Sequence, residues 1–391
     1  MTQRARKLRA QGRDIVVLSQ GEPDFDTPVN IREAGKRAID EGKTRYTAVA
    51  GVLELREAIC RKFKRDNHLD YEPDEITVGG GAKQVLTNAL LATLNSGDEV
   101  LHPAPCWTSY PDMISIADGV PVAIDCTQSH YKITSRQLQA ALTDKTRWLM
   151  LNNPSNPTGG VYSEAELAAL ANVLRKYPNV LVLSDDIYEH LVYAPKRFTT
   201  IAEVAPDLKD RVVTVNGVSK AHAMTGWRIG YGAGPKWLIK AMNLLQSQMT
   251  SHASSIAQYA AIEALDGPQD HLEEFVTAFR ERRDYVHDRL SAVRGLDCGP
   301  SPGGAFYLFI ACHDLIGTRT PAGSTIENDI DFAAYLLEEA NVAVVPGSAF
   351  MANHYIRISY ASSIEELEIA CRRIESACQR LELVVSSSAN A

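Results

Sequence analysis

The chain has 391 residues, of which 45% are hydrophobic and 23% are charged, and its formal net charge is -8 at pH 7. This length exceeds the size at which a single core stops growing, so we expect two domains or one large domain with an appendage. The acidic balance argues against nucleic acid as a main partner, because a phosphate backbone attracts clustered Lys and Arg. No run of about 18 apolar residues is present, so no membrane span is predicted.

The seven cysteines are scattered and form no Cys-x-x-Cys pair. This pattern is typical of reduced thiols in a cytoplasmic protein, and we predict neither disulfides nor a metal site. The basic segment 4–13 is not followed by the long apolar h-region of a signal peptide. We therefore interpret it as a solvated helix rather than as a targeting signal.

Apolar periodicity and turn residues predict an alternation of strands and helices along most of the chain. Strands are predicted at 15–18, 75–78, 99–103, 120–124, 146–151, 179–184, 211–215 and 228–233. Helices are predicted at 4–11, 29–41, 53–67, 82–94, 109–117, 135–142, 163–176 and 235–249. Such alternation favours a largely parallel sheet with helices on both faces.

The remainder of the chain predicts a second, α+β region. A long charged helix at 271–293 is expected to connect the two regions, and the run 303–307 is expected to open a strand. A polar loop follows at 318–328, and the last helix is predicted at 365–383. The tail 386–391 is rich in Ser and Ala, and we expect it to be disordered.

A lysine and an arginine stand eight residues apart after one predicted strand. Lys220 follows the β-branched run 211–215, and ligands of open α/β sheets lie off the carboxyl ends of strands. A desolvated lysine there loses its proton and can attack a carbonyl carbon, as Schiff-base formation requires. Arg228, flanked by Gly226 and Gly230, has the planar fork that suits a phosphate. The alternative interpretation is a surface lysine in a turn and a structural arginine.

Two further strand ends carry polar features. The glycine run 79–81 stands between a predicted strand and a predicted helix, which makes it an anion site or a plain turn. Asp185 follows the apolar run 180–183, so its carboxylate is expected at the same edge of the sheet. Two adjacent acids after a strand, Asp185 and Asp186, are also compatible with a solvated loop.

The spacing Ser219-Lys220 followed by Gly226-x-Arg228-x-Gly230 resembles the pyridoxal-phosphate attachment signature of the class I aminotransferases, which have fold type I. Other family-like motifs follow in family order, at 21–25, 156–159, 184–188 and 357–360, and they span nearly the whole chain. The resemblance implies a large domain with a mostly parallel seven-stranded sheet between helices and a smaller α+β domain. It places the large domain at 35–280 and the small domain at 1–34 and 281–391.

The resemblance also implies a site for pyridoxal 5'-phosphate. Lys220 would form the Schiff base and move the proton, Asp185 would keep the ring nitrogen protonated, and Tyr188 and Asn156 would hydrogen-bond the phenolic oxygen. Trp107 would stack on the pyridine ring and also contact the substrate. The phosphate would be bound by Gly81, Ala82, Ser219 and Arg228, and by Tyr46 of a neighbouring subunit, which implies a homodimer with shared active sites.

For the substrate, Arg357 matches the family's receptor for the α-carboxylate, and Gly21 would close over that group with help from Asn156. Among class I enzymes the chain looks closest to bacterial aspartate aminotransferases, so we expect ping-pong transfer from aspartate to 2-oxoglutarate. Lys83 matches a lysine that would receive the second carboxylate. The alternatives are an aromatic or broad-specificity aminotransferase, a pyridoxal-phosphate-dependent C–S lyase and, outside enzymes, a cofactor-binding regulator.

Two departures from the family pattern stand out. Family members usually carry additional residues before the segment that matches 4–18, and these residues pack on the partner subunit. His252-Ala253 stands where the subgroup more often has Asn-Pro. Both departures concern regions that we expect to contact a second subunit.

Overall fold

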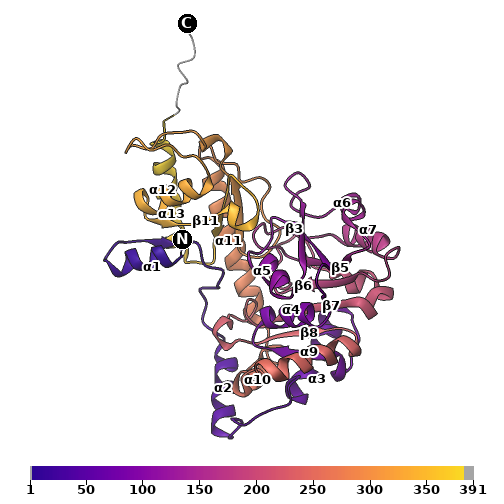
Figure 1. The fold of residues 1–391 in the computed structure, drawn as a ribbon. Helices are drawn as coiled ribbons and strands as arrows, with labels where there is room; N and C mark the ends of the chain where they lie inside the picture. Colours follow the sequence, from indigo (N-terminus) through magenta and orange to yellow (C-terminus); the bar gives the residue numbers. More distant parts are fainter. Residues whose placement is uncertain (1, 383–391) are drawn as a thin grey trace.

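The computed structural model describes residues 2–382 and is organised around one seven-stranded sheet (Figure 1). The strand order is β2-β8-β7-β6-β5-β3-β4, and all neighbouring pairs are parallel except the two that β8 forms. The strands are β2 (Ile76–Gly79), β3 (Glu99–Ala104), β4 (Val120–Asp125), β5 (Thr146–Asn152), β6 (Leu181–Asp185), β7 (Val212–Gly217) and β8 (Gly230–Ala233). The predicted α/β fold with a mostly parallel sheet of seven strands is confirmed.

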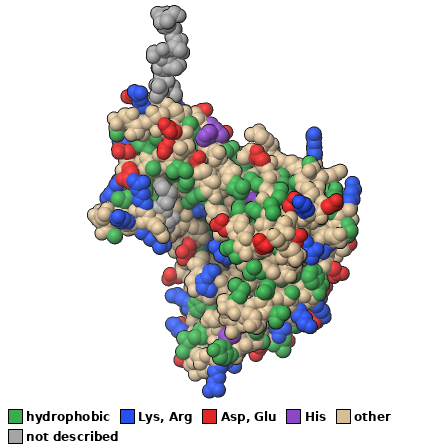
Figure 2. Space-filling model, in the orientation of Figure 1, with side chains coloured by type: hydrophobic (Ala, Val, Ile, Leu, Met, Phe, Trp, Pro, Cys, Tyr) green, Lys and Arg blue, Asp and Glu red, His purple; other side chains and the backbone are tan. Residues whose placement is uncertain are grey.

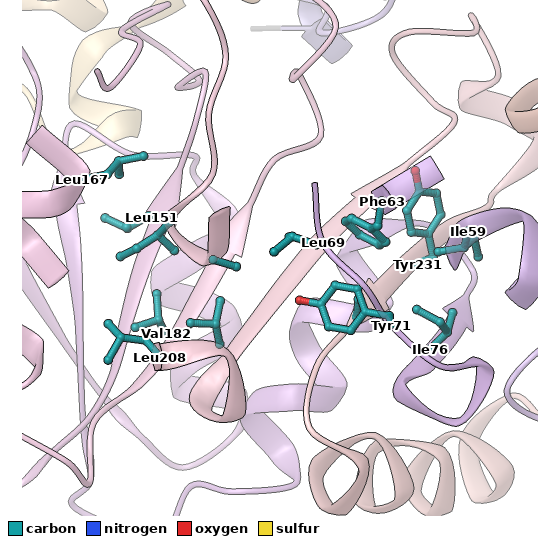
Figure 3. Packing of buried hydrophobic residues seen from close by; sticks show 14 of the residues in the cluster. Ile59, Phe63, Leu69, Tyr71, Ile76, Leu151, Leu167, Val182, Leu208 and Tyr231 are labelled. Carbon is teal, nitrogen blue, oxygen red and sulfur yellow. The ribbon is translucent and has the colours of Figure 1, made fainter. Parts of the chain in front are cut away.

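Helices cover both faces of this sheet, and successive residues of β5 show it. Trp148 packs into a core with side chains of α4, α5 and α9, whereas Leu149 packs into a larger core with side chains of α3, α7 and α10. Figure 3 shows part of the larger core, including Phe63 beside Tyr231. Burial on both faces explains why the central strands are continuously apolar. The helices before residue 270 other than α1 are α2 (Val29–Asp40), α3 (Leu53–Asn67), α4 (Ala82–Leu91), α5 (Ser109–Ile116), α6 (Ser135–Ala141), α7 (Glu164–Leu174), α8 (Ile201–Val204), α9 (Lys236–Met249) and α10 (Ser255–Asp266).

A smaller α+β region packs beside the sheet and holds the three-stranded antiparallel sheet β11-β12-β9 and the parallel pair β1-β10. The long helix α11 runs between the two regions (Figure 1). The elements of this region and its connector are α1 (Thr2–Ala10), β1 (Val16–Val17), α11 (Asp270–Ser291), β9 (Tyr307–Ala311), α12 (Asp329–Glu339), β10 (Val342–Ala343), β11 (Val345–Pro346), β12 (Tyr355–Ser359) and α13 (Ile364–Gln379). The predicted smaller α+β domain is confirmed.

The observed elements differ from the predicted ones in a few places. The strand predicted from residue 228 begins at Gly230, because Arg228 has a left-handed φ of 56° that a strand does not accept. Helix α10 lies in a stretch for which no helix was predicted. The last helix ends at Gln379 rather than at 383. The predicted disorder of 386–391 lies outside the described residues.

Two surface properties bear on the classes of partner. Within residues 2–382, no helix combines the length and the apolar character that crossing a membrane demands. On the face drawn in Figure 2, basic and acidic side chains are interspersed over both regions. This face therefore lacks the single-sign patch that binds a phosphate backbone.

Candidate active site

One cavity of about 560 Å³ opens at the carboxyl ends of the parallel strands. Asn152 ends β5, Asp185 ends β6 and Lys220 follows β7, and all three line this cavity. Parallel strands end at one edge of a sheet, so residues far apart in the sequence meet there. The predicted site residues that line the cavity are Gly21, Ala82, Lys83, Trp107, Asn156, Asp185, Tyr188, Ser219, Lys220, Arg228 and Arg357.

The amine of Lys220 is poised for nucleophilic chemistry. Its Nζ donates a hydrogen bond of 2.6 Å to the carbonyl oxygen of Gly21. Burial, together with the charges of Arg357 and Arg228, lowers the pKa of Lys220 to about 8 against the opposing charge of Glu22. About a tenth of the amine is therefore unprotonated at pH 7, and this is the form that attacks a carbonyl carbon.

Asp185 presents an unsatisfied carboxylate oxygen. The Tyr110 hydroxyl donates to its Oδ2 at 2.7 Å, whereas its Oδ1 has no hydrogen-bond partner among the described residues. Burial raises the pKa of Asp185 to about 6, although Tyr110 and the nearby Ile187 N–H oppose the shift. A buried acceptor without a donor is destabilising by roughly 1–3 kcal/mol. A protonated ring nitrogen would supply the missing donor.

An anion cradle forms where β8 passes the N-terminus of α4. Gly81 caps α4 with a φ of 94°, and a Cβ there would collide with Nη2 of Arg228. A Cβ at Gly230 would collide with the backbone nitrogen of Ala82. Both positions therefore need glycine, which lets backbone N–H groups and the Arg228 fork converge. Ser219 adds a hydroxyl to the cavity wall beside them.

Aromatic and cationic side chains form another wall. Trp107 and Tyr110 meet edge to face, with ring centroids 5.6 Å apart. The Nζ of Lys83 lies 4.6 Å from the centre of the Trp107 ring and donates to Ser109 Oγ at 3.0 Å. Burial and the charge of Arg228 lower the pKa of Lys83. This wall offers a flat face for a ring and a cation beside it.

Arg357 is a buried guanidinium that has donors to spare. It lies on β12 with 6% of its surface exposed, and it donates to Asn156 Oδ1 at 2.9 Å and to the Ser19 carbonyl oxygen at 2.8 Å. Its Nε has no hydrogen-bond partner among the described residues. The ring of Tyr307 lies 4.5 Å from its central carbon, and the hydroxyls of Tyr307 and Tyr188 are 2.7 Å apart. Within residues 2–382 this buried cation contacts neutral groups alone, so it suits an incoming carboxylate.

Two of the predicted residues do not line the cavity. Gly81 is the N-cap of α4, and its N–H donates to the carbonyl oxygen of Gly79 at 2.8 Å. Tyr46 is 92% exposed, and its ring meets the ring of His252 with centroids 5.6 Å apart. The role predicted for Tyr46 concerns the cavity of a neighbouring subunit, and it stays a prediction.

Several lining residues were not predicted. Tyr110 follows Trp107 by three residues, a spacing that places two side chains on one side of a helical turn, so a local signal existed. Tyr307 reaches the cavity only because β9 pairs with β12, and no local pattern indicates that pairing. The other residues of this kind are Arg6, Ser19, Gln20, Glu22, Thr108, Asn152, Ile187, Thr225, Val345 and Phe350.

The arrangement fits pyridoxal phosphate. An open carboxylate oxygen on Asp185 suits the ring nitrogen, the cradle at Arg228 suits the phosphate, and the amine of Lys220 suits the aldehyde. Trp107 supplies a flat wall for the ring. Fold and cavity together define a fold type I enzyme that uses pyridoxal phosphate.

Comparisons with known proteins agree with this class. The family described as aminotransferase class I and II matches residues 13–374. The chain is 54% identical over 382 residues to an aspartate/prephenate aminotransferase of Cereibacter sphaeroides, covering 97% of this chain and 95% of that protein. The chain belongs to the class I and II aminotransferases, and it is a pyridoxal-phosphate-dependent transaminase.

Two solved structures are similar over nearly the full length. The aspartate aminotransferase from Rhizobium meliloti has a TM-score of 0.95 at 53% identity and covers 97% of this chain and 95% of its own. The aspartate aminotransferase from Thermus thermophilus with maleate has a TM-score of 0.89 at 41% identity and covers 96% of this chain and 95% of its own. The predicted family, fold and cofactor are therefore confirmed.

Proposed function

We propose that this enzyme moves the amino group of aspartate to 2-oxoglutarate in a ping-pong reaction. The observation that carries the proposal is the meeting of three groups in one cavity: the Lys220 amine, the open Asp185 oxygen and the buried Arg357 guanidinium. When bound, pyridoxal phosphate supplies an electron sink for the pair of electrons left at the substrate α-carbon. The residues of the chain supply binding, orientation and proton transfer.

In this proposal Lys220 has two roles. It holds the cofactor in the resting enzyme, and once an amino acid displaces it, its free amine removes the proton from the substrate α-carbon. A pKa of about 8 suits both roles, because the amine can accept and return a proton near neutral pH. Asp185 keeps the ring nitrogen protonated, and Tyr188 and Asn156 donate to the phenolic oxygen.

The phosphate and the ring are held by groups around the α4 N-terminus. Ala82 would donate its backbone N–H to the phosphate, Ser219 its hydroxyl and Arg228 its side-chain N–H groups, whereas the Gly81 N–H already donates to the carbonyl oxygen of Gly79 at 2.8 Å. Trp107 would stack on the ring. This assignment is supported by the missing Cβ at Gly81, which lets the Arg228 guanidinium approach the N-terminus of α4.

A dicarboxylic substrate needs two cations, because the free energy of burying a carboxylate without a cationic partner is prohibitively high. Arg357 would take the α-carboxylate, with Gly21 closing over it, and Lys83 would take the distal one. Arg6 also lines the cavity and adds a further cation to its wall. The structure of the Thermus thermophilus relative with maleate, a dicarboxylate, supports a dicarboxylic substrate for this chain. The name of the Cereibacter sphaeroides relative includes prephenate, which is also a dicarboxylate. Prephenate is therefore a second amino acceptor to test.

We further propose a homodimer in which Tyr46 reaches the phosphate of the partner subunit. The exposure of Tyr46 supports it, since a tyrosine that is 92% exposed in one chain gains by being covered in another. The domain boundaries remain proposed at 35–280 for the large domain and at 1–34 with 281–391 for the small one. A cytoplasmic setting is supported by the seven cysteines, all of which are unpaired.

A half-reaction screen tests the proposed substrates. Cofactor-loaded protein is mixed with one amino acid at a time, and the loss of the absorbance of the lysine-bound cofactor is followed. Aspartate and glutamate should react fastest, and 2-oxoglutarate should restore the starting absorbance. Faster reaction with phenylalanine or tyrosine would favour the aromatic alternative, and release of a thiol with ammonia and pyruvate from a sulfur amino acid would indicate a lyase.

A further inference from the structure

A buried ion pair lies behind the cavity, between α3 and the turn that carries Tyr188. Lys62 on α3 is 0% exposed and Glu189 is 5% exposed, and the two side chains form a salt bridge. Asn67 bridges them, because its Oδ1 accepts from Lys62 Nζ at 2.7 Å and its Nδ2 donates to Glu189 Oε2 at 3.0 Å. Figure 3 shows the same stretch of α3 through Ile59 and Phe63. Tyr188 lines the cavity, whereas the next residue, Glu189, does not line it and is held by Lys62 and Asn67.

The polar layer continues to the loop of Lys220. His190 Nε2 lies 3.1 Å from Glu189 Oε1, and the rings of His190 and His222 meet edge to face at 6.3 Å. His222 stands two residues after Lys220 and shares a hydrogen bond of 2.9 Å with His271 on α11. One connected layer therefore joins α3, the Tyr188 turn, the Lys220 loop and the helix between the two regions.

Stability does not account for this ion pair. Burial opposes ionisation of Glu189, yet the charges of Lys62 and His190 outweigh it and hold the pKa of Glu189 well below its usual range. Buried ion pairs contribute little net stability compared with apolar side chains of similar size, because both charges lose their hydration. Asp66, Glu189 and His190 could hold a metal ion by their spacing, but the ammonium of Lys62 already supplies a cation there. The remaining use of such a pair is to fix geometry.

We propose that Lys62 and Glu189 are positioning residues for the transamination site. Their ion pair fixes the turn that places Tyr188 against Tyr307, and through His190 and His222 it fixes the loop that carries Lys220. The inference rests on the proposed roles of Tyr188 and Lys220. Neither member of the pair lines the cavity, so each acts only through other residues.

The double variant Lys62→Met/Glu189→Gln tests this proposal, because it removes both buried charges and keeps an acceptor for Asn67. Its thermal midpoint should stay close to that of the wild type, since no unpaired charge is left. Its kcat should fall about tenfold or more while KM for aspartate changes little, as misplacement of reacting groups produces. The apo-protein should also bind pyridoxal phosphate about tenfold more weakly, measured by quenching of tryptophan fluorescence.

Ile59→Val is the matched control, because Ile59 is a fully buried residue of the same helix outside the polar layer. A double variant that matches this control in kcat and cofactor affinity would overturn the proposal. If the double variant does not fold, Asn67→Ser is measured instead, and it should lower kcat and cofactor affinity in the same direction. Wild-type kcat in that variant would overturn the proposal. Failure of the wild type itself to transaminate would refute the proposed function and, with it, this inference.

Discussion

Asp185 should lower the stability of the cofactor-free protein. Its pKa is raised from an ordinary 3.8 to about 6 by burial. The folded protein holds this proton more tightly than the unfolded chain does. The contribution of the protonated Asp185 carboxyl to the free energy of unfolding is therefore fully present below about pH 4 and is lost as the pH rises through about 6. A shift of about two pKa units corresponds to about 3 kcal/mol of lost stability at pH 7.

The variant Asp185→Asn measures this cost. It keeps the shape of the side chain and a partner for Tyr110 but cannot ionise. Without cofactor it should be about 3 kcal/mol more stable than the wild type at pH 7, and the gain should shrink towards zero near pH 4. Urea unfolding of both apo-proteins at the two pH values gives the numbers. Saturating pyridoxal phosphate should stabilise the wild type far more than the variant, because only the wild type pairs a carboxylate with the ring nitrogen.

Asp118→Asn controls for the loss of one negative charge, since Asp118 lies exposed in a turn at a φ of 62° that asparagine also accepts. This control should unfold at the wild-type urea concentration at both pH values. If Asp185→Asn is no more stable than the wild type at pH 7, the buried carboxylate is not strained as described. A gain that persists unchanged at pH 4 would also refute the reasoning, because it could not arise from ionisation.

Three further predictions concern the site. Borohydride reduction of the loaded protein, followed by peptide mapping, should find the cofactor on Lys220, and its recovery on another lysine would refute that assignment. Lys83→Ala should raise KM for aspartate strongly and spare alanine and phenylalanine, because only aspartate presents a second carboxylate; equal losses for all three would make Lys83 a phosphate or structural residue. Tyr46→Phe should weaken cofactor binding by about 1 kcal/mol, the value of one hydrogen bond, and a fully active monomer in sedimentation would contradict the shared site.

The parts of the site that the sequence predicted are those with local signals. Lys220 and Arg228 stand at a fixed spacing after a β-branched run, and Asp185 follows an apolar strand. Strand ends of a parallel sheet converge whatever the helices between them do, so these local signals sufficed to bring the three residues together. The alternation of elements predicted the large sheet for the same reason.

The parts that the sequence did not predict depend on contacts between distant segments. Tyr307 enters the cavity through the pairing of β9 with β12, and Arg6 enters it from α1 at the start of the chain. Strand β8 pairs antiparallel with both β2 and β7, and the direction of a strand leaves no periodicity in the sequence. Helix α10 packs its small residues against α2 and α3, and its own apolar pattern is too uniform to mark a face.

The acid and the base of this site are tuned by one physical cause. Removal of water disfavours the charged form of any group, so it raises the pKa of Asp185 to about 6 and lowers the pKa of Lys220 to about 8. Both values move towards neutrality, where a proton can be held or transferred with little driving force. Entry of water into the cavity would therefore lower the pKa of Asp185 and raise the pKa of Lys220, which would leave an ionised carboxyl and a fully protonated amine. The small region supplies Arg357 and Tyr307 to the cavity that holds Asp185 and Lys220, so residues of both regions form one site.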